Sequence, residues 1–507
     1  MVLLGLLGLP FLYQRTTEVG LTDLPKKPRE LVEVARRHAD AARGEGAVRD
    51  EAWGWTRSAD LPDSFALARS PATPRILFWY RESPDYLLPT GWPPWVTLDN
   101  PDPGTSDVVT VITTPAGSVL ELRAVSTPSP SDHGGSGAER SGSFRVAELL
   151  VFLAGNLALL VGLVYGPYAS LRGRGDPRAA FWLSSVFLST YLIWWLLKAD
   201  DVFALPHPDR LVGLLVVAVP LSLFVFVGHR GFEALVEDRC PFLRLESWKQ
   251  LLNGRFQMEA VGQDTLVGAV AGVAVTYLLG LAYLAATELL SAEMEPQEVS
   301  LGALLGARQV AAHYFLLLWS SIVSAFQFLS FLVLLLLVFR LRWLAVAIFL
   351  LASTAMASDL GGLLDAAGRE TVVEVGTAAV TAGVVAFVLL RWGLLALFSM
   401  HVFHNISSYF ALTFDPGSWY FASTIVVIAT FVCAGLVAFE VWSGAAAPAA
   451  VTRSITGVLS WPFPLYNWLL RLVAKVEESL WYRVLRILAA ILGGVSGLGY
   501  LLFQGRT

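Results

Sequence analysis

Long apolar segments constrain this 507-residue chain more than any other feature. From Val146 onward, eight segments are long and apolar enough to cross a bilayer as helices, and two weaker ones follow. The eight lie at residues 146–168, 179–198, 211–228, 266–286, 311–339, 343–357, 375–398 and 419–439, and the weaker two at 455–473 and 487–503. Only 15% of the residues are charged, against roughly 25% in an ordinary soluble protein. A water-soluble globule is excluded, and the fold class expected is mainly α, a polytopic helical membrane bundle of about 8–10 spans.

The N-terminal part of the chain is polar, apart from its first residues. Residues 1–13 are apolar, but a helix of that length rises only about 20 Å, short of a hydrocarbon core about 30 Å thick. We expect a hydrophobic anchor there, or the end of a transmembrane helix that begins further upstream. The remaining boundaries are expected at residues 14–126 for a small α+β domain, 127–145 for a flexible linker, 146–440 for an eight-span membrane domain and 441–507 for a C-terminal region with two weaker spans.

Periodicity and turn chemistry predict the elements of the α+β domain, which we call the head. A helix is expected over residues 28–42, a strand over 76–84, and a hairpin over 107–125 that turns at residues 115–117. The head is rich in aromatic residues, which either line a ligand pocket or, as we favour, fill the core of a small domain. These residues are Trp53, Trp55, Trp79, Tyr80, Trp92 and Trp95.

The basic residues of the short loops predict the orientation in the membrane. Loops after the first, third and fifth apolar segments hold ten Lys and Arg residues, whereas those after the second, fourth and sixth hold only Arg210, Arg308 and Arg369. Because basic loops stay in the cytoplasm, the first set is expected inside and the head outside. Counting one crossing per segment also places Lys475 and Arg483, with Arg486, on the cytoplasmic side.

One polar cluster in the membrane body suggests catalysis. The sequence FSMHVFHN matches the last element of CAAX-type intramembrane proteases, with His401 and Asn405 four residues apart. That spacing would place both side chains on one face of a helix, toward a metal or a water. The EExxxR element that should precede it is missing, because the two glutamates at residues 477–478 lie downstream and Tyr482 replaces the arginine. We therefore favour a structural role for these residues and for His404. No catalytic residue, cofactor or metal is assigned, and His401, His404 and Asn405 are the only metal candidates.

Motifs and charge argue against several other functions. The chain has no Walker sequence, no kinase HRD or DFG motif, and no glycine-rich loop followed by a VAIK lysine. Its net charge of −5, without a run of five basic residues, argues against nucleic acid as a partner. A transporter usually places acids inside its spans, and these spans have nearly none. The lipid bilayer is the partner that composition indicates, and the oligomeric state is not indicated.

Several segments together resemble one family. They read FWYRESPDYLLP (78–89), TLDNPDPG (97–104), LRGRGDPRAAF (171–181), ESWKQLLNGRFQMEAVGQDTLVG (246–268) and LTFDPGSWY (412–420). They resemble the extracytoplasmic and membrane region of acidobacterial-type serine/threonine protein kinases, over roughly residues 14–440. Glu259, Ala260 and Gln263 depart from that pattern. The resemblance implies a bacterial inner (plasma) membrane, an extracytoplasmic N-terminal domain, and a cytoplasmic kinase domain or signalling partner whose place is upstream of Met1.

The resemblance is densest in the loop at residues 242–256. Apolar Leu245, Trp248 and Leu252 recur at helical spacing, which predicts a short helix along the cytoplasmic interface with Trp248 at the level of the lipid headgroups. We interpret Arg244, Trp248, Lys249 and Arg255 as an interaction loop, with a plain amphipathic connector as the alternative. The function expected is that of a non-catalytic integral membrane protein, the sensor and membrane portion of a serine/threonine-kinase-type receptor. The alternative is an intramembrane hydrolase of the CAAX-protease type or a transporter.

Overall fold

The computed structural model describes most of the chain up to Ser443. The described residues are 2–43, 47–62, 65, 68, 73–87, 89, 95–101, 108–124, 162, 164–198, 208–339, 341–358 and 368–443. The linker expected at 127–145, most of the first apolar segment, and both weaker segments after Ser443 lie outside them.

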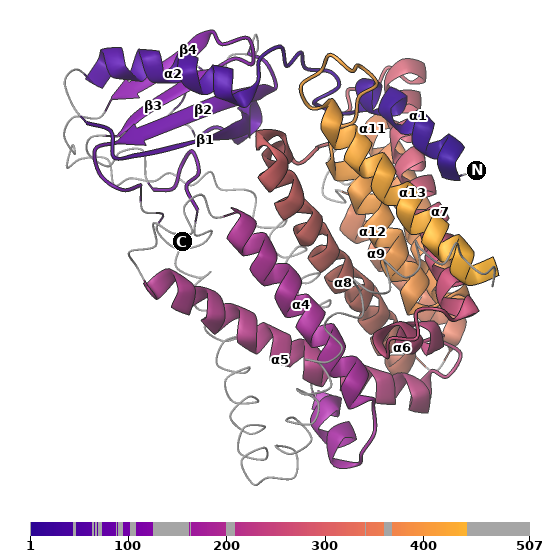
Figure 1. Ribbon diagram of the computed structural model, residues 1–507. Helices are drawn as coiled ribbons and strands as arrows, with labels where there is room; N and C mark the ends of the chain where they lie inside the picture. The colour runs from indigo at the N-terminus through magenta and orange to yellow at the C-terminus, as the bar shows by residue number, and fades with distance from the viewer. Residues whose placement is uncertain are drawn as a thin grey trace.

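The head is a four-stranded antiparallel sheet covered on one face by a helix (Figure 1). Strand order follows the chain, and the elements are α2 (Pro28–Arg43), β1 (Asp50–Arg57), β2 (Ile76–Ser83), β3 (Val109–Thr113) and β4 (Val119–Ala124), with a 3-10 turn η1 (Ser58–Asp60) after β1. Leu31, Val32 and Ala35 of α2 are buried against Phe78 and Val111 of the sheet. The predicted helix, the strand at 76–84 and the hairpin are therefore confirmed, whereas β1 was not predicted.

The membrane body is a bundle of mainly apolar helices. They are α1 (Val2–Thr16), α4 (Pro177–Lys198), α5 (Pro208–Arg239), α7 (Glu259–Leu284), α8 (Ala307–Val338), α9 (Arg342–Ala357), α11 (Arg369–Arg391), α12 (Leu394–Tyr409) and α13 (Phe421–Ser443). Shorter pieces are α6 (Glu246–Leu252), the π-helical turn η3 (Ala285–Leu289) and the 3-10 turn η4 (Leu301–Leu305). In the described part of the chain, six helices are long and apolar enough to cross a membrane. The chain is thus a polytopic membrane protein.

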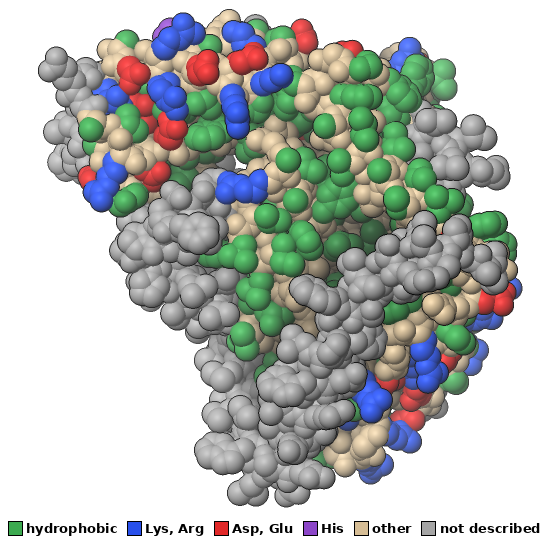
Figure 2. Space-filling model, in the orientation of Figure 1, with side chains coloured by type: hydrophobic (Ala, Val, Ile, Leu, Met, Phe, Trp, Pro, Cys, Tyr) green, Lys and Arg blue, Asp and Glu red, His purple; other side chains and the backbone are tan. Residues whose placement is uncertain are grey.

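The bundle has two distinct ends. At the head end, Ser300 donates to the Tyr409 carbonyl, and Thr17 pairs with Gln297 beside the sheet. At the opposite end, which we call the α6 end, the Leu394 amide donates to the Arg244 carbonyl (Figure 1). Charged side chains gather over the head and near α6, while apolar side chains cover much of the bundle surface between them (Figure 2). That distribution is typical of a bundle surrounded by lipid.

The apolar segment expected at 375–398 is two helices rather than one. α11 ends at Arg391, and Gly393 then takes φ 94°, a conformation that L side chains rarely adopt. A Cβ on Gly393 would lie 2.0 Å from the Arg244 carbonyl oxygen, so the chain can turn against α6 only at a glycine. The turn has no polar residue between Trp392 and Phe398, which is why hydropathy merged the two helices.

This break reverses the direction expected for the last described helix. α12 returns to the head end, and α13 therefore begins there and runs toward the α6 end, where Ala438 and Trp442 lie against Gly262. The count that placed Lys475 and Arg483 in the cytoplasm treated residues 375–398 as one crossing. Because α11 and α12 run in opposite directions, the count changes by one and no longer supports that placement. Those residues themselves lie outside the described part of the chain.

Small residues allow the central helices to approach closely. α7 packs along α12, where a Cβ on Gly268 or Gly272 would lie 2.3–2.4 Å from a carbonyl oxygen of α12. Helix α1 packs on the second half of α7, with Leu12 against Gly280. Close contact between helix backbones at small residues is the usual way that helices associate within a bilayer.

Candidate functional site: a cleft between the head and the bundle

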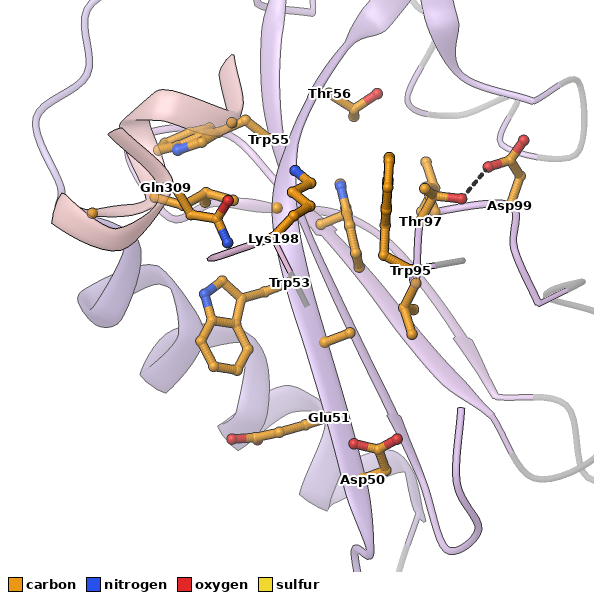
Figure 3. Close-up of a pocket in the computed structure, with 18 of the residues that line it drawn as sticks. Asp50, Glu51, Trp53, Trp55, Thr56, Trp95, Thr97, Asp99, Lys198 and Gln309 are labelled. Carbon is orange, nitrogen blue, oxygen red and sulfur yellow. Dashed lines mark hydrogen bonds between the residues drawn. The ribbon is translucent and has the colours of Figure 1, made fainter. Parts of the chain in front are cut away.

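A cleft of about 1200 Å³ separates the head from the head end of the bundle. Strand β1 and the segment at 95–99 supply the head side, and the bundle side comes from the end of α4 and the start of α8 (Figure 3). The lining residues are Arg29, 48–56, Asp60, Pro62, Trp79 and 95–99 from the head, and Lys198, Gly302 and 305–309 from the bundle. The cleft is therefore built by both parts of the protein.

Four of the six aromatic residues singled out in the sequence line this cleft. Trp53 is 38% exposed, and Trp95 packs edge-on against Trp194 of α4 with ring centroids 5.5 Å apart. Trp55 and Trp79 line the cleft and also belong to the hydrophobic core, as the favoured interpretation expects of them. Tyr80 lies in the core, and Trp92 lies outside the described residues.

Two buried polar atoms of the lining have no hydrogen-bond partner within the described structure. They are the indole Nε1 of Trp55, a donor, and the amide Oε1 of Gln309, an acceptor. Each residue is only 7% exposed. An unsatisfied buried polar group costs about 1–3 kcal/mol, and native proteins rarely keep one without a reason. A ligand in the cleft that offers an acceptor and a donor would remove that cost.

The formal charges of the lining cancel. The cleft is lined by four basic residues, Arg29, Arg49, Lys198 and Arg308, and by four acids, Asp50, Glu51, Asp60 and Asp99. Some are already paired: Arg36 of α2 donates to Glu51 at 2.7 Å, and this hydrogen bond raises the pKa of the Arg36 guanidinium. The Lys198 ammonium lies 5.5 Å from the centre of the Trp95 ring. The cleft therefore does not select strongly for either sign of charge.

Contacts beside the cleft join β1 to the bundle. The Arg57 guanidinium donates to both carboxylate oxygens of Glu18 at 2.7–2.8 Å and to the Val299 carbonyl at 3.0 Å. Glu18 also accepts from the Val299 amide at 3.0 Å. Trp55 stacks on Trp419, which precedes α13, with centroids 6.4 Å apart. A movement of β1 therefore reaches the connections of α1, α8 and α13 directly.

The histidine cluster does not converge on one point. His401 stacks on Phe328 of α8, whereas the His404 ring hydrogen-bonds to Thr276 of α7. Asn405 donates to Ser321 of α8 at 3.0 Å. Within the described residues, no group of three or more His, Cys, Asp or Glu side chains is placed to hold a metal. The three side chains thus contact two different helices, α7 and α8.

Two of the three segments of the membrane body that carry the family resemblance, 171–181 and 246–268, meet at the α6 end. Asp176 accepts a hydrogen bond from Asn253 at 2.7 Å, and its amide donates to Glu233 of α5 at 2.7 Å. Lys249 pairs with Glu233 at 2.9 Å. These bonds join the start of α4, the end of α5 and α6 into one unit, a link that no single segment of sequence indicated.

The structure places the four residues of the predicted interaction loop differently from one another. The short helix is confirmed as α6, but Trp248 is 3% exposed and packs between Phe326 and Phe398. Its ring therefore faces the interior of the bundle and not the outer surface of the protein, because the apolar stripe of α6 packs against the bundle core. Arg244 and Arg255 are exposed, and Lys249 is held by its acidic partners.

No family model, no curated protein and no solved structure matches this chain. The arrangement of the cleft and of the α6 end thus carries the functional argument.

Proposed function

We propose that this chain is the non-catalytic sensing and membrane portion of a serine/threonine-kinase-type receptor. In this proposal the cleft binds a ligand, and the α6 end passes the response to a kinase domain or another signalling partner. One observation carries the proposal: residues of both the head and the bundle line the cleft. A ligand that touches both walls stabilises one placement of the head relative to the bundle.

Helix α8 offers a physical route from the cleft to the α6 end. Gln309 lies in the cleft in the first turn of α8, and Phe326 of the same helix packs edge-on against Trp248 of α6 at 5.7 Å. Seventeen residues of helix separate the two positions, which is about 25 Å. A shift of α8 at the cleft would therefore be felt by the buried tryptophan of α6.

The α6 end has the features expected of an output surface. Arg244 and Arg255 are exposed there, while the polar network around Asp176 and Glu233 fixes α6 on α4 and α5. The resemblance to the membrane region of bacterial kinases is densest in the same loop, and basic loops favour the cytoplasm. We propose accordingly that α6 faces the cytoplasm of a bacterial inner membrane and the head lies outside.

Two arginine variants of the head test this transmission. Arg57→Ala removes the contact from β1 to Glu18 and Val299, whereas Arg36→Ala removes an ion pair to Glu51 inside the head. We expect deuterium uptake by the peptide covering Glu246–Leu252 to change in Arg57→Ala and to stay at the wild-type level in Arg36→Ala. Mass spectrometry of the full chain in lipid nanodiscs measures both. Equal uptake by α6 in the two variants would overturn the sensor proposal.

A further inference from the structure

We infer that the cleft takes an extended peptide segment, which adds to the free edge of β1 as a fifth strand. This inference rests on the proposed function, because it names the class of ligand for the same cleft.

Strand β1 presents an unpaired edge to the cleft. It is the outermost strand of the sheet, and all of residues 48–56 line the cleft. Ser58 donates to the Arg75 carbonyl at 2.8 Å, in line with the register that pairs Arg57 with Ile76. Hydrogen-bonded pairs alternate along an antiparallel ladder, so the even-numbered residues of β1 bond to β2.

The odd-numbered residues therefore direct their backbone groups into the cleft. These are Glu51, Trp53 and Trp55, and outside the β1–β2 ladder no backbone hydrogen bond joins their amide or carbonyl groups to another described residue. Natural sheets usually cover or blunt such an edge because it is a template for pairing with another chain. An edge that stays open beside a cleft is the arrangement used when an extended peptide adds a strand.

The side walls suit the alternating side chains of such a peptide. Figure 3 shows Trp53, Trp55 and Gln309 on one side of β1, Trp95 and Thr97 on the other, and Lys198 between them. Successive residues of an added strand point to opposite faces and so meet the two walls in turn. Polar groups of the peptide would satisfy Trp55 Nε1 and Gln309 Oε1, the two buried atoms without partners.

A saccharide fits these observations less well. Sugars stack on tryptophan rings, and the exposed face of Trp53 would serve them too. However, the free edge repeats a donor and an acceptor at every second residue, a spacing of about 7 Å that matches another extended backbone. The cancelling charges of the lining also argue against a highly charged polymer. The edge thus favours a peptide.

The test uses the full chain in lipid nanodiscs and a displayed library of random decapeptides. A selected peptide is synthesised with single N-methyl groups along its length, and its affinity is measured by fluorescence anisotropy. We expect N-methylation to weaken binding at least tenfold at every second residue and less than threefold at the residues between. On the protein side, Glu51→Pro should bind at least tenfold more weakly than Glu51→Ala, since both lose the carboxylate and only proline lacks the outward amide.

Each outcome decides the inference. Failure to select any peptide, or losses on N-methylation that do not alternate, would overturn it. Binding of an immobilised oligosaccharide that is lost in Trp53→Ala, without peptide binding, would instead identify a saccharide site. The sensor proposal is judged separately: alternating peptide losses with no response of α6 in Arg57→Ala would sustain the peptide site and refute the sensor. A response of α6 in Arg57→Ala, together with peptide losses that do not alternate, would refute the peptide site and leave the sensor proposal standing.

Discussion

Replacing Gln309 by methionine should stabilise the protein, because it removes a buried oxygen that we expect to bind the ligand. The Gln309 Oε1 atom is buried and has no partner within the described structure, and the side chain lies in the first turn of α8. Methionine has nearly the same shape and no polar oxygen. The helix is not disturbed, because the hydrogen bond that His313 makes to residue 309 uses the main-chain carbonyl.

The magnitude follows from the missing hydrogen bond. A buried acceptor without a partner costs about 1–3 kcal/mol, and replacing it by an apolar group recovers that cost. Asn405→Leu is the matched control, because the Asn405 amide donates to Ser321 at 3.0 Å and its loss leaves a hydroxyl without that donor. We expect Gln309→Met to unfold at higher denaturant concentration than wild type, and Asn405→Leu at lower.

The assay is denaturant unfolding of the full chain in one detergent, followed by tryptophan fluorescence. An unfolding midpoint for Gln309→Met at or below the wild-type value would show that the amide oxygen is already satisfied. The cleft would then lose one of the two atoms that mark it as a binding site.

Three further predictions concern the α6 end, the histidines and the head. Trp248→Ala should lower the free energy of unfolding by about 3–5 kcal/mol, because the side chain is buried; a cost under 1 kcal/mol in the same denaturation assay would place it on the surface instead. The double variant His401→Ala/His404→Ala should keep its fold, and the wild-type chain should carry no stoichiometric zinc; elemental analysis showing one zinc per chain, lost in the variant, would contradict this. Burial raises the pKa of Glu82 above its ordinary value, although its bonds to Tyr80 and Arg43 oppose the shift. The folded state then holds the proton more tightly than the unfolded state, so stability should fall as the pH rises from about 4.5, and Glu82→Gln should remove this slope in thermal unfolding curves.

Hydropathy and periodicity predicted much of this fold because they report local properties. Apolar length identified the described spans, and turn residues identified the hairpin of β3 and β4. Strand β1 was not predicted because Gly54 stands between its aromatic residues. The strand needs glycine at this position because the Trp79 ring packs against it. A Cβ there would lie 2.8 Å from that ring, a contact between strands that no local pattern reveals.

The candidate site was harder to predict because it is assembled from distant segments. The sequence singled out the tryptophans of the head, but not Lys198, the last residue of one apolar segment, or Gln309, which lies two residues before another. For Trp248 the helical spacing correctly predicted an apolar stripe. It did not reveal that α8 and α12 supply the surface that buries this stripe. Amphipathic spacing gives the existence of a buried face but not its partner.

The two ends of the bundle must face opposite sides of the membrane if the chain is a transmembrane sensor. Cys240 would be a natural probe of the α6 end, but it is 2% exposed and burial raises the pKa of its thiol. Exposed positions serve better: Arg172 lies in the turn that precedes α4 at the α6 end, and Pro416 lies in the loop that precedes α13 at the head end.

The most direct test is therefore labelling of single cysteines in spheroplasts by a thiol reagent that cannot cross membranes. Cys433 is exposed and is first changed to serine, after which Arg172→Cys and Pro416→Cys are introduced separately. We predict that Pro416→Cys is labelled in intact spheroplasts and Arg172→Cys only after lysis. Labelling of Arg172→Cys alone from outside, or of both at the same rate, would contradict the proposed path from an external cleft to a cytoplasmic output.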